Sequence, residues 1–222
     1  MNLTLFDLDG TLLPQDSDHL FGEFMVARGW ADGAEFKRRN DAFYADYLAG
    51  RLDMTAYVDF ATRPWRDREP ADIAAASQTF MGQWVQPLLT DVARALVAQH
   101  VQAGDHVVVV TATNEFVTRP IAQAFGVQEL IATELARDAS GRVTGAIRGV
   151  PSFREGKITR VHAWLQAQGV DWSSVTRSTF YSDSTNDLPL LEHVSHPVVT
   201  NPSPALERIA LERGWPLLKL FA

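Results

Sequence analysis

Cysteine is absent from this sequence, which excludes disulfide bonds, a thiolate nucleophile and zinc-thiolate sites. Basic residues are in the minority, because 20 lysines and arginines stand against 27 aspartates and glutamates, for a formal net charge of −7. This charge disfavours nucleic acid or an acidic membrane surface as the main partner. No apolar run approaches the length of a membrane span, and no basic segment precedes the first apolar stretch. We therefore expect a cytoplasmic protein, with its oligomeric state left open.

The sequence does have the composition and the alternating pattern of a globular α/β protein. Hydrophobic residues make up 46% and charged residues 21% of the 222 residues, and a chain of this length can bury a substantial core. Short apolar runs that predict buried strands alternate with segments of helical spacing. The clearest run, residues 106–110, is rich in valine, as in a parallel sheet covered on both faces.

One segment departs from this alternation, because residues 16–85 are nearly all helical in pattern. Apolar residues recur there at helical spacing, and Asp53 is a predicted helix N-cap. We interpret this segment as a helical cap domain, inserted after the first strand into a core domain of residues 1–15 and 86–222. The aromatic residues of the cap are expected to be mainly packing residues.

The first strand ends in two carboxylates, Asp7 and Asp9, followed by Gly10 and Thr11. Side chains alternate along a strand, and a turn at Gly10 would bring both acids to the crevice beyond the strand's carboxyl end, where ligands bind in open α/β sheets. Two acids so close repel each other unless a cation or a proton lies between them. The alternative is turn chemistry alone, because Asp-Gly is a common turn dipeptide.

Three later segments carry polar residues that would reach the same sheet edge. Thr111 and the amide of Ala112 precede a helix, where they would receive a phosphate or simply cap the helix. Lys157 lies in the first turn of a helix, the unfavourable end for a cation, although most such lysines are surface groups. Asp183 and Asp187 follow another strand. They are either further carboxylates of the same metal site, or a turn residue and a helix N-cap with no shared role.

Together these residues predict a site for phosphoryl transfer. Oxygen ligands without cysteine or a histidine cluster favour Mg²⁺, which keeps several waters and shares its other positions with a substrate phosphate. Asp7 would attack phosphorus and form an aspartyl-phosphate, while Mg²⁺ and Lys157 shield its charge from the incoming dianion. Asp9 would give a proton to the leaving alcohol and later take one from water.

The run of residues 7–11 (DLDGT), with Thr111, Lys157 and residues 183–187 (DSTND), resembles the four motifs of the haloacid dehalogenase (HAD) superfamily in order and spacing. The place of the helical insert is similar to that in subfamily IB, the phosphoserine-phosphatase-like branch. This resemblance implies a doubly wound, Rossmann-like α/β core with a helical cap, and a phosphatase that acts with Mg²⁺.

The resemblance also implies a role for each matched residue. The side chains of Asp7 and Asp183 and the backbone carbonyl of Asp9 would bind Mg²⁺, whereas Asp187 would orient metal-bound waters. The catalytic residues would be the nucleophile Asp7, the acid/base Asp9 and Lys157, which also holds phosphoryl oxygens. The metal-site residues would be Asp7, Asp9, Asp183 and Asp187, and the phosphate-binding residues would be Thr111, Ala112 and Asn186.

The substrate is expected to be a small phosphate ester, with phosphoserine and histidinol phosphate as candidates. Residues 111–114 (TATN) replace the Ser-Gly-Gly that is usual in phosphoserine phosphatases, and their greater bulk puts phosphoserine in doubt. Stretches 16–19, 40–44 and 181–184 resemble small bacterial HAD proteins often labelled histidinol-phosphatase.

Two cap residues are candidate substrate contacts. Asp16 would contact a substrate ammonium or serve as a helix N-cap, and Arg51 would contact a carboxylate. Two other functions use the same catalytic residues: a mutase-like phosphotransferase, and a signalling module that holds phosphate on Asp7 without turnover.

Overall fold

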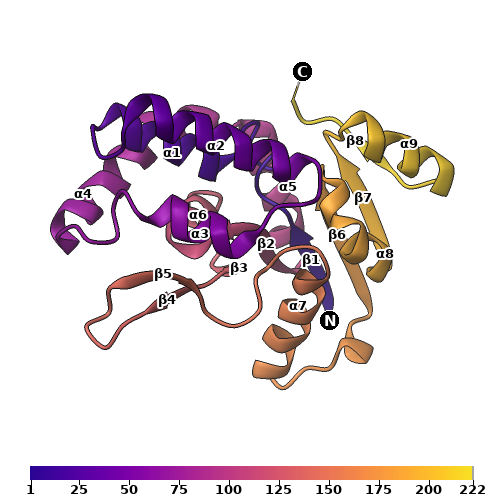
Figure 1. The fold of residues 1–222 in the computed structure, drawn as a ribbon. Coiled ribbons are helices and arrows are strands. Elements are labelled where there is room, and N and C mark those ends of the chain that lie inside the picture. Colours follow the sequence, from indigo (N-terminus) through magenta and orange to yellow (C-terminus); the bar gives the residue numbers. More distant parts are fainter. Residues whose placement is uncertain (222) are drawn as a thin grey trace.

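The structure is a computed structural model that describes residues 1–221, and its centre is one six-stranded parallel sheet flanked by helices (Figure 1). The strand order is β3-β2-β1-β6-β7-β8, so the chain builds outward from β1 on one side and then on the other. The strands are β1 (Asn2–Phe6), β2 (His106–Asn114), β3 (Glu129–Thr133), β6 (Arg177–Ser182), β7 (His196–Thr200) and β8 (Leu217–Leu218). The predicted doubly wound α/β class is confirmed.

Alternation along the strands divides the core into two layers. Leu3 and Leu5 of β1 pack in one buried cluster with side chains of α7 (Glu155–Ala167), α8 (Leu188–His193) and α9 (Pro204–Arg213). Phe6, on the opposite face, packs in the other cluster with side chains of α5 (Asp91–Gln102) and α6 (Glu115–Ala124). Both faces of the sheet are therefore covered, as the valine-rich β2 predicts.

Four helices lie between β1 and α5 in the sequence, and Figure 1 shows them gathered on one side of the molecule. They are α1 (Ser17–Ala27), α2 (Gly33–Leu48), α3 (Met54–Thr62) and α4 (Pro70–Phe80), and the last continues into a π-helical turn, η1 (Met81–Val85). Asp53 is the N-cap of α3, as predicted, because its side chain accepts hydrogen bonds from two backbone amides. Phe21 and Phe24 of α1 pack in the same cluster as Phe6, so this helix is continuous with the core. We keep the division into core and cap as a proposal.

The strand predicted at 106–110 needs correction, because it continues through Asn114, which pairs with Thr133 of β3 after an irregularity. Helix α5 begins at Asp91, since the Thr90 hydroxyl accepts a hydrogen bond from the Ala93 amide and caps the helix there. The residues after Trp215 add the short strand β8 to the sheet edge.

A hairpin of β4 (Leu135–Arg137) and β5 (Val143–Ile147) forms a separate two-stranded antiparallel sheet. It packs against α3 of the inserted helices. Within residues 1–221, no helix combines the length and the apolar character that crossing a membrane requires.

Candidate active site

The carboxyl ends of β1, β2 and β6 meet at one sheet edge, beside the point where the strand order reverses. Ligands bind at this position in open α/β sheets. A cavity lies there between the sheet and the inserted helices. Its lining includes Asp7, Asp9, Thr111, Ala112 and Thr113 from the core, and Asp16, Asp18, Tyr44, Tyr47 and Tyr57 from the inserted segment. Asp7 and Asp9 therefore reach one cavity, as the alternation along β1 predicts.

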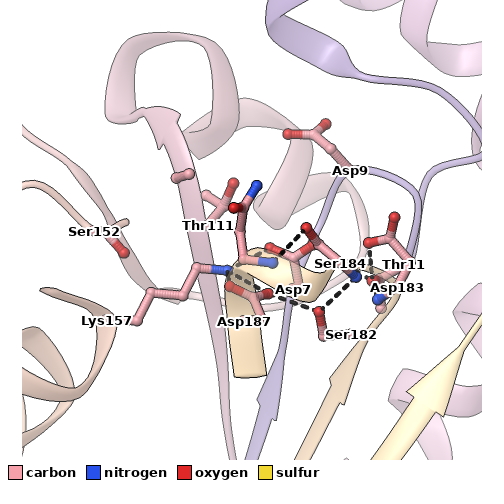
Figure 2. Close-up of polar contacts among 12 residues, drawn as sticks. Asp7, Asp9, Thr11, Thr111, Ser152, Lys157, Ser182, Asp183, Ser184 and Asp187 are labelled. Atoms are coloured by element: carbon pink, nitrogen blue, oxygen red, sulfur yellow. Dashed lines mark hydrogen bonds and ion pairs between the residues drawn. The ribbon is translucent and has the colours of Figure 1, made fainter. Parts of the chain in front are cut away.

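The ammonium of Lys157 lies between two buried carboxylates (Figure 2). Its Nζ donates to Asp7 Oδ1 at 2.8 Å and to Asp187 Oδ2 at 2.7 Å, and the Lys157 side chain is only 1% exposed. Leu3 and Leu5 face the α7 layer, and Asp7 continues this alternation, so its carboxylate meets the first turn of α7. We call Asp7, Asp187 and Lys157 the compensated group.

This geometry decides two of the open alternatives. Lys157 is not a surface group, and the Asp187 side chain makes no capping hydrogen bond. Asp187 Oδ2 also accepts from the Ser182 hydroxyl at 2.7 Å, which fixes the carboxylate at the end of β6.

Two carboxylates against one ammonium leave the compensated group with excess negative charge. Burial raises the pKa of Asp7 to about 7; the charge of Asp187 adds to the rise and Lys157 opposes it. Burial alone would lower the pKa of Lys157, but the charges of Asp187 and Asp7 outweigh it and raise that pKa. Lys157 is therefore a permanent cation at physiological pH.

The side chains of Asp7 and Asp183 meet at a shared hydroxyl, where a hard cation would fit. Thr11 Oγ1 lies 3.4 Å from Asp7 Oδ2 and 3.1 Å from Asp183 Oδ1, and it accepts from the Asp183 amide at 3.1 Å. Gly10, at φ +77°, leaves room for Asp183, because a Cβ there would come within 2.3 Å of Asp183 Oδ2. Burial, and then the charges of Asp7 and Asp187, raise the pKa of Asp183 well above its ordinary value.

The side chains of Asp7 and Asp183 offer carboxylate oxygens, the ligand type of Mg²⁺. No cluster of three or more His, Cys, Asp or Glu side chains in residues 1–221 has the arrangement of metal ligands. Two carboxylates with a backbone carbonyl leave positions for water and phosphate, which is the coordination that Mg²⁺ favours.

A second set of acids, Asp9, Asp16 and Asp18, lines the cavity without a cation. Among the described residues, none of these three carboxylates is in an ion pair, and the residues that line the cavity include no lysine or arginine. Burial comes first among the causes that raise the pKa of each of these acids to about 7. We call these three residues the uncompensated group.

Neutral donors hold the uncompensated group in place. Asp9 Oδ1 accepts from the Ser17 amide at 2.8 Å, and Asp9 Oδ2 accepts from the Thr113 hydroxyl at 2.9 Å. Asp18 Oδ1 accepts from Asn114 Nδ2 at 3.2 Å, and the Tyr57 hydroxyl also hydrogen-bonds this carboxylate.

Asp16 is the N-cap of α1, since its Oδ1 accepts from the Asp18 and His19 amides at 3.0 and 2.7 Å. The N-cap interpretation of Asp16 is therefore confirmed. It is also compatible with a substrate contact, because Asp16 lines the cavity.

Two predicted residues lie in other contacts. Asn186 is buried, but its amide donates to the Tyr47 carbonyl at 2.8 Å, at the C-terminal end of α2. Arg51 is exposed and pairs with Asp46 at 2.9 Å, and the structure does not bring it into the cavity lining.

Thr111 and Ala112 are in the cavity lining, as predicted for a phosphate-binding strand end. The cap of the following helix, α6, is Asn114, whose Oδ1 accepts from the Val117 amide at 3.2 Å. Helix capping therefore does not account for the Thr111 hydroxyl, which instead accepts from the Thr113 amide at 3.2 Å.

Sequence reasoning missed four polar residues of the site: Thr11, Asp18, Thr113 and Ser182. Thr113 had a signal, because it shares strand parity with Thr111. Thr11 also had one, since it closes the run that begins at Asp7. Asp18 had none, because its partner Asn114 is 96 positions away in the sequence. Ser182 had one, since it lies on the strand end five positions before its partner Asp187.

Fold and site together define an α/β hydrolase in which carboxylates and one lysine meet at the carboxyl edge of a parallel sheet. The chain belongs to the haloacid dehalogenase-like hydrolase family, whose sequence description matches residues 4–192. It is an enzyme of the phosphatase type, as the relatives below indicate.

The relatives include enzymes and structures of similar length. The chain is 42% identical to a histidinol-phosphatase of Neisseria meningitidis serogroup C, over 98% of both chains. It is 29% identical to a phosphoserine phosphatase of Mycobacterium tuberculosis, over 95% of this chain and 68% of that one. A Bordetella pertussis Tohama I structure described as of unknown function has a TM-score of 0.93 and 48% identity, over 99% of both chains. A substrate-bound phosphoserine phosphatase shares the fold, with a TM-score of 0.68 at 14% identity, over 99% of this chain and 93% of that one.

Proposed function

We propose that this protein hydrolyses phosphate monoesters of small metabolites, with Asp7 as the nucleophile and Mg²⁺ as the metal ion. The observation that carries the proposal is the 2.8 Å contact of Lys157 Nζ with Asp7 Oδ1 inside a buried crevice. A fixed cation beside the nucleophilic carboxylate reduces its repulsion of an incoming phosphate dianion. Membership of the HAD family and the phosphatase names of the relatives support the same chemistry.

The reaction has two steps that balance. A carboxylate oxygen of Asp7 attacks phosphorus, the bond from phosphorus to the leaving oxygen breaks, and Asp9 passes a proton to that oxygen. Asp9 then takes a proton from the water that attacks the aspartyl-phosphate, which releases phosphate and restores Asp7. Lys157 and the Thr111 segment hold the phosphoryl oxygens.

A metal ion completes this site. Asp7, Asp183 and the Asp9 carbonyl would hold Mg²⁺, with Asp187 placed to orient its waters. When bound, the ion neutralises negative charge on Asp7 and on the phosphoryl group.

The test is Asp7→Asn, which removes the nucleophile with little change in volume. We expect release of inorganic phosphate from small esters with Mg²⁺ to fall by about 10⁴-fold or more. Asp46→Asn is the matched control, since Asp46 is half exposed and pairs only with Arg51. A wild-type rate in Asp7→Asn would contradict the nucleophile assignment, and transfer of phosphate to an added alcohol would favour a phosphotransferase.

The cavity favours histidinol phosphate over phosphoserine as the substrate. Its described lining presents the acids Asp16 and Asp18 and no lysine or arginine, so a protonated amine is attracted while the carboxylate of phosphoserine is repelled. The histidinol-phosphatase name of the Neisseria meningitidis relative supports the same choice.

The ratio of kcat/KM for L-histidinol phosphate and phosphoserine tests this preference. We expect the wild type to prefer histidinol phosphate by about tenfold or more. Like charges that face each other across a binding site weaken binding by several kcal/mol. Asp18→Asn should reduce the ratio while p-nitrophenyl phosphate hydrolysis continues. An equal or reversed wild-type ratio would contradict the substrate choice and leave the phosphatase function standing.

A further inference from the structure

We propose that Thr113 is a positioning residue for the acid of the reaction: its hydroxyl holds the Asp9 carboxylate in the orientation that delivers a proton to the leaving oxygen. This inference rests on the function proposed above, in which Asp9 protonates the leaving alcohol. The Thr113 amide donates to Thr111 Oγ1, whereas the Thr113 hydroxyl donates to Asp9 and makes no described hydrogen bond with the compensated group, so the effect of the hydroxyl passes through Asp9.

Each oxygen of Asp9 has its own donor, and the two donors come from different parts of the chain. The Ser17 amide, at the start of α1, donates to Oδ1 at 2.8 Å. The Thr113 hydroxyl, on β2, donates to Oδ2 at 2.9 Å. Donors at both ends oppose rotation of the carboxylate about its Cβ–Cγ bond.

The Thr113 hydroxyl is itself held rigidly by the sheet. Thr113 is 8% exposed, and its amide donates to Thr111 Oγ1 at 3.2 Å. The next residue, Asn114, pairs with Thr133 of β3 and caps α6, so the backbone cannot shift freely on either side. A β-branched side chain adds a restricted χ1 angle. The same strand end thus presents Thr111 to the cavity and fixes Asp9 in relation to it.

Among the described hydrogen bonds, the donor to Oδ2 is the Thr113 hydroxyl. Asp9 is not in an ion pair, and its neighbours Asp16 and Asp18 are acids that repel its charge. Without the Thr113 hydroxyl, Oδ2 loses its donor and the carboxylate can turn about the Ser17 amide. A displacement of about 1 Å in such a group costs roughly 10²-fold in rate.

A proton is needed only when the leaving group is a poor one. An alkoxide leaving from an alkyl phosphate needs the Asp9 proton, whereas p-nitrophenolate is stable without it. The quantity kcat/KM covers the steps through departure of the leaving group, because that departure is the first irreversible step. A defect in positioning the acid therefore appears as a loss that depends on the leaving group.

The experiment compares kcat/KM for p-nitrophenyl phosphate with kcat/KM for the better alkyl ester of L-histidinol phosphate and phosphoserine, with Mg²⁺ present. In Thr113→Val, which keeps the shape and removes the hydroxyl, we expect kcat/KM for the alkyl ester to fall by about tenfold or more. The value for p-nitrophenyl phosphate should change by less than about threefold. Thr113→Ser should restore most of the alkyl ester activity.

The matched control is Thr133→Val, which removes another buried hydroxyl from the neighbouring strand. Thr133 Oγ1 donates to the Ala112 carbonyl at 2.7 Å and does not contact Asp9. Any loss in this variant should be the same for both esters. Equal losses for the two esters in Thr113→Val, or no rescue by Thr113→Ser, would overturn the proposal.

Asp9→Asn separates this inference from the function on which it rests. If Asp9→Asn affects the alkyl ester far more than p-nitrophenyl phosphate and Thr113→Val does not, only the positioning proposal fails. If Asp9→Asn affects both esters equally, Asp9 is not the acid, and both proposals about Asp9 fail. A wild type inactive on every ester would contradict the proposed phosphatase function instead.

Discussion

The compensated group reaches the cavity through Asp7, the uncompensated group lines it with all three acids, and the two groups hold negative charge in opposite ways. In the compensated group, one ammonium donates to both carboxylates, and the side chains are at most 4% exposed. In the uncompensated group, each acid is held by neutral donors: backbone amides, hydroxyls or a side-chain amide. A built-in cation favours an ionised acid, whereas an acid without one favours a proton or a cation that arrives with a ligand. We infer that the first group serves the phosphate and the second serves the leaving group.

The largest effect should come from removing the cation of the compensated group. Lys157→Met keeps the length of the side chain but leaves Asp7 and Asp187 buried without a partner. We expect unfolding in urea to show a loss of about 3–5 kcal/mol, and phosphatase activity to fall by about 10²–10³-fold.

Lys37→Met is the control for this change, because Lys37 is exposed in its ion pairs with Glu23 and Asp41. It should keep both the stability and the rate of the wild type. Equal effects of the two substitutions would show that burial of the Lys157 pair is unimportant.

A smaller effect should follow from adding Mg²⁺, because binding would relieve the charge that Asp7 and Asp183 share. At a concentration about 100 times its Kd, a ligand of the folded state adds about 2.7 kcal/mol of stability. Thermal melts with and without Mg²⁺ should therefore differ for the wild type. Asp183→Asn should abolish the difference, whereas Asp46→Asn, on exposed α2, should keep it. A shift that persists in Asp183→Asn would place the ion elsewhere.

Per pH unit, the smallest of these effects should be a pH dependence that comes from the uncompensated group. Burial raises the pKa of Asp18 from 3.8 to about 7 in the folded state, so the folded protein binds this proton more tightly than the unfolded chain does. The resulting stability is complete below pH 3.8 and is lost as the pH rises through about 7. Asp18→Asn should therefore flatten the fall in unfolding free energy over this range, by at most about 1.4 kcal/mol per pH unit.

Urea unfolding of the metal-free protein at a series of pH values measures this dependence. Asp46→Asn should keep the slope of the wild type. A slope that is unchanged in Asp18→Asn would mean that Asp18 remains ionised when buried.

The fold was predictable because its signals are local. The valine-rich β2 and the apolar β1 follow from residue type and spacing over short distances. The prediction failed where pairing with another strand extended an element, at residues 111–114. There the partner strand supplies the hydrogen bonds that keep the backbone extended.

The site was predictable to the same degree and for the same reason. Asp7, Asp9, Asp183 and Asp187 could be placed at strand ends from the sequence, because a parallel sheet brings those ends to one edge. Arg51 could not be placed, since its position depends on how α2 ends and on its ion pair with Asp46. The individual catalytic roles of the four aspartates stay predictions, which the substitutions above test.

The class of sheet and the types of side chain at its carboxyl edge follow from the sequence, because strand alternation and turn residues act within a few positions. The contacts between individual polar side chains at that edge follow only from the tertiary structure. Lys157 reaches Asp7 across 150 positions, and Thr113 reaches Asp9 across 104. These contacts depend on the packing of α7 against one face of the sheet and on the register of β2 beside β1, and neither is encoded in a short stretch of chain.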